Sequence, residues 1–252
     1  LPLGRDGDMA DVRVSAGKIR QYWQANTVAT LLASPDNPTG SVLTAVECAA
    51  IAAAVRDLGG ALIVDEIYQG LVYDQPVHSV LSSAPDALVL NSFSKYFGMT
   101  GWRLGWMVAP PEQVPALERM AQNFFIAPPT MSQHAALAAF LPETRAELDR
   151  RRDVLNARRT LLLDALPALG LRVIGEPQGA FYIYLDVSAI TDDSFAFCEQ
   201  LLEQEFVALT PGADFGAVHG PEKCLRIAYT TDEARLAEAL DRLQRFIARN
   251  GK

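Results

Sequence analysis

The 252-residue sequence predicts an α/β fold, with a mostly parallel sheet in its first part and a smaller α+β domain at its C-terminal end. The parallel sheet is predicted by a strand–helix–strand pattern, in which the apolar runs 28–32 and 61–64 flank an alanine-rich helix over 44–58. Thr44 and Glu47 have the spacing of a capping box at the start of that helix. Two strands joined by such a helix are expected to run parallel.

The division into two domains is predicted by a long helical pattern of charged and apolar residues over 143–166. Pro167 and Gly170 end this pattern, and short apolar strands and amphipathic helices follow it. We therefore expect a large domain over residues 1–142 and a small C-terminal domain over 143–252, which includes the long linking helix.

Hydrophobic periodicity predicts the remaining elements. Two further buried strands of the large domain are expected at 87–90 and 104–109. Strands of the small domain are expected at 171–174, 181–185, 207–209 and 224–228. Further helices are expected over 12–23, 112–125, 130–140, 191–206 and 232–249.

Composition excludes several classes of function. The formal net charge of -8 argues against a nucleic-acid partner and against an anionic membrane surface. No apolar run reaches the roughly 18 residues that a membrane-spanning helix needs. Half of the residues are hydrophobic, which is typical of a globular protein with a substantial core.

The cysteines and histidines form no cluster in the sequence. Cys48, Cys198 and Cys224 are an odd and scattered set, so we expect reduced thiols in a cytoplasmic protein. The three histidines, His78, His134 and His219, are equally scattered. A metal site is not expected.

The segment that carries most chemistry is the polar loop between the predicted strands 87–90 and 104–109. It contains Ser92, Ser94, Lys95 and Arg103. A partly buried lysine is suited to Schiff-base formation with a carbonyl, because burial frees the amine as a nucleophile. An arginine eight residues later offers a planar fork for a phosphate. A solvated surface loop would explain an isolated S-x-x-K pattern, but lysine and arginine together suggest pyridoxal 5'-phosphate.

Two further polar groups follow predicted strands. Asn37 lies in the turn Asn-Pro-Thr-Gly after the first strand, and Asp65 ends the second strand, three residues before Tyr68. Each has a structural interpretation, since Asn and Asp often bend or cap turns. Their functional interpretation is ligand binding at the carboxyl ends of the strands of an open α/β sheet. Glu66 is expected to be structural or to face solvent.

Arg226 lies inside the apolar strand 224–228. From the pattern alone, its side chain points to the solvent face of an alternating strand or toward a ligand, and neither alternative is favoured. If it faces a ligand, its guanidinium can bind a carboxylate with two parallel hydrogen bonds.

These motifs together resemble the class I/II aminotransferases, the fold type I pyridoxal-phosphate enzymes related to aspartate aminotransferase. The resemblance rests on Ser-Phe-Ser-Lys at 92–95, Thr-Gly-Trp-Arg-Leu-Gly at 100–105, Asn-Pro-Thr-Gly at 37–40, Asp-Glu-Ile-Tyr at 65–68 and the arginine strand around Arg226. The segments fall in the family's order along nearly the whole chain. The resemblance implies the large domain of a pyridoxal-phosphate transferase.

The resemblance also implies a role for each residue. Lys95 would bind the cofactor covalently and act as the catalytic acid and base. The cofactor phosphate would be held by Ser92 and Arg103, with Ser94 in the same cofactor-binding segment. Asn37 and Tyr68 would bind the cofactor's phenolic oxygen, and Asp65 its pyridine nitrogen. Arg226 would hold the α-carboxylate of the substrate, with Asn37 also in the substrate site.

The implied reaction moves an amino group between an L-amino acid and a 2-oxo acid, in a homodimer whose active site lies at the subunit interface. The family's glycine-rich phosphate loop and cofactor-stacking aromatic residue have no counterpart in this sequence. We therefore expect that the large domain is incomplete, that the N-terminal part is lacking, and that these residues alone bind the cofactor weakly.

Two alternatives remain at this point. A lyase or decarboxylase can use the same cofactor scaffold, since the reaction depends on which Cα bond stands perpendicular to the ring. Arg226 and the run 100–105 favour transamination, and dependence on a keto acid would separate the two. A non-catalytic fragment is the other alternative, and the presence of Lys95 argues against it.

Overall fold

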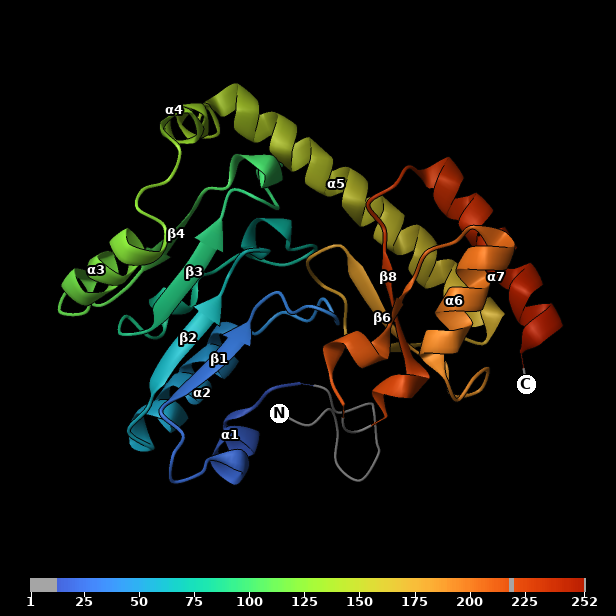
Figure 1. Cartoon of the computed structure of the whole chain (residues 1–252), viewed down its shortest axis with the longest axis horizontal. Coiled ribbons are helices and arrows are strands. Elements are labelled where there is room, and N and C mark those ends of the chain that lie inside the picture. The colour runs from blue at the N-terminus through green and yellow to red at the C-terminus, as the bar shows by residue number, and fades with distance from the viewer. Residues whose placement is uncertain (1–12, 218–219, 252) are drawn as a thin grey trace. The chain divides into compact units, whose positions relative to one another are not determined.

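The computed structural model describes residues 13–217 and 220–251 (Figure 1). The chain forms two compact units. Unit 1 contains Val14–Asp36 and Val42–Arg152, and unit 2 contains Arg13, Asn37–Ser41 and the described chain from Asp153 onward. The long helix α5 (Pro142–Ala165) therefore starts in unit 1 and ends in unit 2. The division into functional domains at residues 142 and 143 stays a prediction.

Unit 1 is built on a four-stranded sheet with the order β1-β2-β3-β4. Strands β1 (Ala29–Ala33), β2 (Ala61–Asp65) and β3 (Leu88–Ser92) run parallel, which confirms the mostly parallel α/β fold. Strand β4 (Gly105–Val108) pairs with β3 in the antiparallel direction. The sheet is therefore mixed, because the loop between β3 and β4 returns the chain directly beside β3.

Two expectations of burial in this sheet are wrong. All four residues of β4 are exposed, although the sequence predicts a buried strand there. Leu31 of β1 is also exposed, in a strand that the sequence predicts to be buried. Both strands lie at the edges of the described sheet, so each has a hydrogen-bonded neighbour strand on one side only. An apolar run therefore predicts that a strand forms, but it does not predict whether other elements bury that strand.

Two capped helices accompany the parallel strands. Helix α1 (Ala16–Tyr22) begins after Ser15, whose hydroxyl accepts a hydrogen bond from the Lys18 amide; Val12, where this helix was expected to begin, lies outside the described residues. Helix α2 (Ala45–Asp57) has the predicted capping box between Thr44 and Glu47. Ile51 and Val55 of α2 are buried in the core of unit 1, with Val64 of β2 and Val89 of β3.

After β4 the chain forms α3 (Val114–Phe124) and α4 (Thr130–Ala138), and then α5. No residue of α3 is buried within the described structure. Short 3-10 helices lie at Gln69–Leu71, Val80–Ser82, Thr100–Trp102, Leu166–Leu169, Gly212–Phe215 and Pro221–Lys223.

Unit 2 is built on an antiparallel sheet with the order β5-β6-β8-β7. Its strands are β5 (Arg172–Ile174), β6 (Tyr182–Asp186), β7 (Thr210–Pro211) and β8 (Cys224–Ala228). The strand expected at 207–209 is displaced, since pairing begins only at Thr210, which lies opposite Arg226. Helices α6 (Ser194–Glu205) and α7 (Glu233–Asn250) complete the unit.

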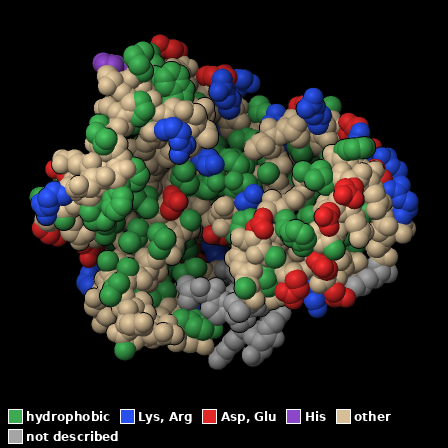
Figure 2. Space-filling model, in the orientation of Figure 1, with side chains coloured by type: hydrophobic (Ala, Val, Ile, Leu, Met, Phe, Trp, Pro, Cys, Tyr) green, Lys and Arg blue, Asp and Glu red, His purple; other side chains and the backbone are tan. Residues whose placement is uncertain are grey.

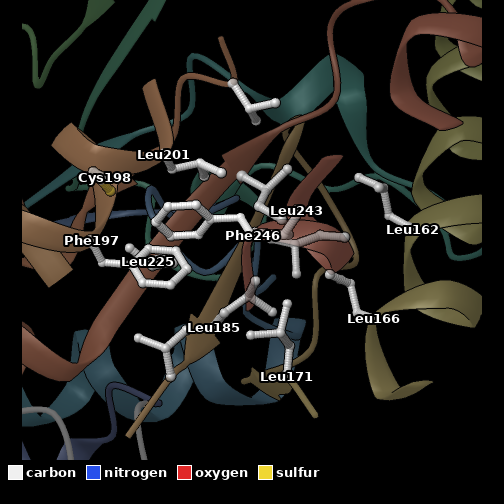
Figure 3. Packing of buried hydrophobic residues seen from close by; sticks show 14 of the residues in the cluster. Leu162, Leu166, Leu171, Leu185, Phe197, Cys198, Leu201, Leu225, Leu243 and Phe246 are labelled. Carbon is white, nitrogen blue, oxygen red and sulfur yellow. The ribbon is translucent and has the colours of Figure 1, made fainter. Parts of the chain in front are cut away.

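The core of unit 2 is formed by the second half of α5, the central strands and helices α6 and α7 (Figure 3). Leu162 and Leu166 meet Leu185 and Leu225 of the two central strands in one buried cluster. The rings of Phe197 in α6 and Phe246 in α7 pack edge to face, with 5.0 Å between their centroids. This arrangement gives the central strand β8 a rigid support.

The surface of unit 1 exposes a number of large hydrophobic side chains, and hydrophobic side chains are visible on the face drawn in Figure 2. Phe124, Phe125 and Ile126, at the end of α3, have exposed fractions of 73%, 78% and 85%. In the described part of the chain, no helix is both long and apolar enough to cross a membrane.

Candidate active site

The carboxyl ends of β1, β2 and β3 meet at one edge of the unit 1 sheet. Ala33 at the end of β1 lies in register with Asp65 at the end of β2, and Asp65 lies in register with Leu90 of β3. The loop that contains Lys95 begins at Ser92, two residues after Leu90. Asp65 and the Lys95 loop therefore both lie at the carboxyl ends of the strands, which is where open α/β sheets bind ligands.

Hydrogen bonds close the Lys95 loop on itself. Ser92 Oγ accepts from the Ser94 amide at 3.0 Å, and it donates toward the Leu104 carbonyl oxygen at 3.1 Å. The Oγ atoms of Ser92 and Ser94 are 2.9 Å apart. Thr100 Oγ1 donates to the Ser94 carbonyl oxygen at 2.6 Å. The hydroxyl of Ser92, which was expected to bind a phosphate, thus lies beside that of Ser94 at the base of this loop.

Arg103 ends the same loop. Its backbone has φ of 51°, in the left-handed region, and its Nη1 donates to the Thr100 carbonyl oxygen at 2.9 Å. No Asp or Glu among the described residues forms an ion pair with Arg103, and the residue is exposed. An arginine whose charge has no acidic partner has its fork available for an external anion.

Asp65 and Tyr68 lie in the turn that follows β2. Asp65 Oδ1 accepts a hydrogen bond from the Ile67 amide at 2.9 Å. Asp65 therefore caps the turn, as its position in the sequence suggests. The Tyr68 side chain is 5% exposed, and the Lys95 Nζ atom lies 5.7 Å from the centroid of its ring. The structure therefore brings Tyr68 and Lys95 together, from two loops at one edge of the sheet.

Glu66 is a buried carboxylate that the sequence leaves between a structural and a solvent-facing role. It is 4% exposed, and its Oε1 accepts from the Val80 amide at 2.7 Å and from the Ser79 hydroxyl at 3.0 Å. Its Oε2 accepts from Gln69 Nε2 at 3.0 Å. Burial raises the pKa of Glu66, although these hydrogen bonds oppose the shift. Glu66 therefore fastens the segment after β2, which includes Tyr68.

In unit 2, Arg226 of β8 contacts Asn37. Arg226 Nη1 donates to Asn37 Oδ1 at 2.7 Å, and its Nη2 donates to Thr210 Oγ1 at 3.3 Å. The guanidinium carbon lies 4.2 Å from the ring centroid of Tyr182 and 4.7 Å from that of Phe215. The guanidinium is thus held between two aromatic rings and is half-buried, which distinguishes it from a solvated surface arginine.

The charge of Arg226 has no acidic partner in the part of the chain that the structure describes. Among the described residues no carboxylate forms an ion pair with it, and its Nε atom is buried without a hydrogen-bond acceptor. A buried donor without an acceptor is unfavourable by about 1–3 kcal/mol. A carboxylate ligand would supply the missing negative charge.

Gly40 holds the turn that contains Asn37 in place within unit 2. This glycine has φ of 70°, and a Cβ atom on it would lie 2.7 Å from the Gly179 carbonyl oxygen. The Gly179 amide donates to the Gly40 carbonyl oxygen at 2.8 Å. Only glycine permits this approach, which explains the last residue of the Asn-Pro-Thr-Gly turn.

Each unit thus holds its own group of the predicted site residues. Unit 1 contains Asp65, Tyr68, Ser92, Ser94, Lys95 and Arg103, and unit 2 contains Asn37 and Arg226. The sequence gives no role to Thr210 and Phe215, which contact the guanidinium of Arg226. The run Pro-Gly-Ala-Asp-Phe-Gly at 211–216, which resembles the family's loop before the arginine strand, contains Phe215 and directly follows Thr210, so it was an available signal for both.

Comparison with known proteins identifies the family of the chain. Residues 16–243 match the model of the family described as aminotransferase class I and II. The chain is 43% identical to valine–pyruvate aminotransferase of Mycobacterium tuberculosis over 84% of this chain and 55% of that protein. It is 36% identical to aspartate/prephenate aminotransferase of Thermus thermophilus over 92% of this chain and 60% of that protein.

Comparison with a solved structure also gives an aminotransferase. The chain superimposes on the crystal structure of an aminotransferase from Mycobacterium tuberculosis with a TM-score of 0.92 and 38% identity, over 99% of this chain and 64% of that one. The chain therefore spans about 55–60% of the length of the curated relatives it matches. It belongs to the aminotransferase class I and II family, whose members depend on pyridoxal 5'-phosphate.

Proposed function

We propose that the protein is a pyridoxal-phosphate-dependent aminotransferase that moves an amino group between an L-amino acid and a 2-oxo acid. The observation that carries the proposal is the Lys95 loop. At the strand end near Asp65 and Tyr68 this loop brings together an amine, two hydroxyls and a guanidinium that forms no ion pair within the described residues. Membership of the family supports the same conclusion.

The side chains of unit 1 fit the cofactor. The Ser92 and Ser94 hydroxyls and the Arg103 guanidinium would hold its phosphate, because they offer hydrogen bonds and a positive charge without an acidic partner. The Asp65 carboxylate would pair with the pyridine nitrogen and keep it protonated. The Tyr68 phenol would donate to the phenolic oxygen, and Lys95 would bind the cofactor covalently.

When bound, the cofactor supplies an aldehyde that condenses with amines and a ring that withdraws electrons from the substrate Cα. The protein's part is to place its own groups around that chemistry. Once the substrate amine has displaced it from the cofactor, the Lys95 amine would take the proton from the substrate Cα as the catalytic base and then donate a proton as the acid. The ionised Asp65 would favour this step, because a protonated pyridine nitrogen accepts electron density more readily.

Substrate binding falls to unit 2 in this proposal. Arg226 would bind the α-carboxylate of the amino acid with its planar guanidinium, whose charge no carboxylate among the described residues pairs with. Asn37 Oδ1 accepts from Arg226 Nη1, which fixes the orientation of the guanidinium and turns the Asn37 amide nitrogen away from it. That nitrogen would be the donor to the cofactor's phenolic oxygen.

The proposal includes a homodimer in the cytoplasm. The exposed aromatic side chains of Phe124 and Phe125, with 6.2 Å between ring centroids, support a contact with a second subunit. The three cysteines are buried and form no disulfide, which supports a reducing compartment. The residue roles given above and the division into a cofactor domain and a small domain belong to the same proposal.

The reaction type is tested by supplying a panel of L-amino acids to the protein with pyridoxal phosphate, in the presence and absence of 2-oxoglutarate. An aminotransferase releases the keto acid of the donor in catalytic amounts only when 2-oxoglutarate is present. Sustained turnover without a 2-oxo acid, or release of carbon dioxide, would show a lyase or a decarboxylase instead. The matched variants are Lys95→Ala, expected to be inactive, and Lys18→Ala on α1, expected to keep activity.

A further inference from the structure

Tyr96, the residue after Lys95, joins three separate segments of unit 1. Its side chain is 8% exposed, and its hydroxyl donates to Asp149 Oδ1 of α5 at 2.7 Å. Its ring lies against Gly70, in the short helix that follows Tyr68. The Lys95 loop is thereby tied to α5 on one side and to the Tyr68 turn on the other.

The contact with Gly70 leaves no room for a side chain. A Cβ atom on Gly70 would lie 2.3 Å from Tyr96 Cγ and 2.7 Å from Tyr96 Cβ, which is closer than unbonded carbon atoms approach. The backbone after Tyr68 and the ring after Lys95 are therefore in direct contact. A shift of the Tyr96 ring must change the spacing between the two segments that carry Tyr68 and Lys95.

The contact with Asp149 fixes the other side of the ring. Asp149 also accepts a hydrogen bond from Arg152 Nη1 at 3.1 Å, and the Arg145 guanidinium carbon lies 5.3 Å from the Tyr96 ring centroid. Burial and the bond to Asp149 raise the pKa of Tyr96 to about 12. The phenol therefore stays protonated near neutral pH and can donate to Asp149 throughout that range.

We infer that Tyr96 is a positioning residue, which holds the Lys95 amine beside the Tyr68 ring by bracing the Lys95 loop between Gly70 and Asp149. The inference rests on the proposed function in one respect, that Lys95 is the reactive amine. Tyr96 acts through the backbone of the loop and touches neither substrate nor cofactor in this account. The turn after Lys95, in which the Gly98 amide donates to the Lys95 carbonyl oxygen at 3.0 Å, transmits the constraint.

The test measures the reactivity of Lys95 in protein without cofactor. The chain has four lysines, Lys18, Lys95, Lys223 and Lys252, so acetic anhydride labelling followed by peptide mass spectrometry gives Lys95 labelling relative to Lys18 in the same sample. Tyr96→Phe keeps the ring against Gly70 and removes the bond to Asp149. Asp149→Ala removes the same hydrogen bond from the acceptor side and leaves the Tyr96 side chain unchanged. The Asp149 side chain is 46% exposed, so its truncation creates no buried cavity.

We expect the ratio of Lys95 to Lys18 labelling to rise about fivefold in Tyr96→Phe and in Asp149→Ala. The reason is that the loss of one hydrogen bond raises, by about that factor, the population of loop conformations in which the Lys95 amine is accessible to the reagent. Asp149→Asn keeps an acceptor oxygen and is expected to restore the wild-type ratio. Tyr229→Phe is the matched control, since it removes a buried phenol that donates to the Ala180 carbonyl oxygen in unit 2. It should leave the ratio unchanged.

A wild-type ratio in both Tyr96→Phe and Asp149→Ala would overturn the inference, and so would an equal rise in Tyr229→Phe. The outcome is separable from that of the proposed function. If borohydride reduction fails to mark Lys95 while the labelling ratio shifts as expected, the positioning of Lys95 stands and its role as the cofactor lysine falls.

Discussion

At the scale of single residues, the contacts of Arg226 indicate most clearly what the residue does. Its guanidinium is held by Asn37, Thr210 and two aromatic rings, and it lacks a carboxylate partner among the described residues. A lysine at this position would keep the positive charge but lose the planar fork and the contacts with the rings.

We therefore expect Arg226→Lys to raise KM for the amino donor by about 10- to 100-fold, the equivalent of one charged hydrogen bond of about 1.5–3 kcal/mol. Steady-state kinetics with varied donor concentration measures the change. Arg235→Lys, at an exposed position of α7, is the matched control and should leave KM unchanged. A wild-type KM in Arg226→Lys would show that the carboxylate is bound elsewhere.

Asp65 has a structural and a functional interpretation that one substitution separates. Asp65→Asn keeps an oxygen that can accept from the Ile67 amide, so the turn should survive. If the carboxylate keeps the pyridine nitrogen protonated, the rate of Cα deprotonation should fall by about two or more orders of magnitude. Single-turnover kinetics measures this rate. Near-normal turnover at unchanged thermal stability would reduce Asp65 to a turn cap.

Sequence alone locates residues such as Lys95 and Asp65, because each lies in a short motif at a strand end. It cannot give the bond between Asn37 and Arg226, which joins residues 189 positions apart. Nor can it give the burial of Glu66, because an acid next to a strand end is compatible with a solvated side chain. These contacts depend on how distant segments meet.

At the scale of elements, the segment from Glu66 to Val80 is held by one buried carboxylate. Glu66→Ala would leave the Val80 amide without its acceptor, which should destabilise the protein by about 1–3 kcal/mol. Glu66→Gln keeps an acceptor for that amide and should cost less than about 1 kcal/mol. Denaturant unfolding at neutral pH compares the two variants. Equal destabilisation by both would show that the negative charge itself is required.

The same residue predicts a pH dependence of stability. Burial raises the pKa of Glu66 above its ordinary value of 4.5, so the folded state holds this proton more tightly than the unfolded chain. The stability that this proton contributes is complete below that value and is lost as the pH rises through the raised pKa. Glu66→Gln has no such proton to lose. Its stability relative to wild type should therefore rise between pH 4.5, the ordinary pKa of the carboxyl, and neutral pH, as measured by denaturant unfolding. A difference that stays constant or falls over this range would contradict the shift.

The elements show where periodicity succeeds and where it fails. Helix α2 has the predicted capping box, because a cap is a local feature that needs only Thr44 and Glu47. The burial predicted for 104–109 is wrong, because the same apolar run is compatible with a central strand and with the edge strand β4. The strand expected at 207–209 begins instead at Thr210, since its register is set by pairing with β8.

At the scale of the whole molecule, the proposed homodimer gives the aromatic side chains at the end of α3 a partner. Replacing Phe124 and Phe125 with serine should weaken dimerisation by at least about tenfold, because aromatic anchors carry much of the energy of an interface. Sedimentation velocity over a range of protein concentrations measures the dissociation constant. Replacing Phe195, an exposed aromatic of α6 in the other unit, is the control. A wild-type protein that is monomeric at all concentrations would contradict the dimer.

The central claim is that Lys95 is the amine to which pyridoxal phosphate becomes attached. Borohydride reduction of the protein in the presence of pyridoxal phosphate, followed by peptide mapping, tests it most directly. We expect a stable label on the peptide that contains Lys95, and loss of that label in Lys95→Ala. A label on Lys18 or Lys223 at the expense of Lys95 would contradict it.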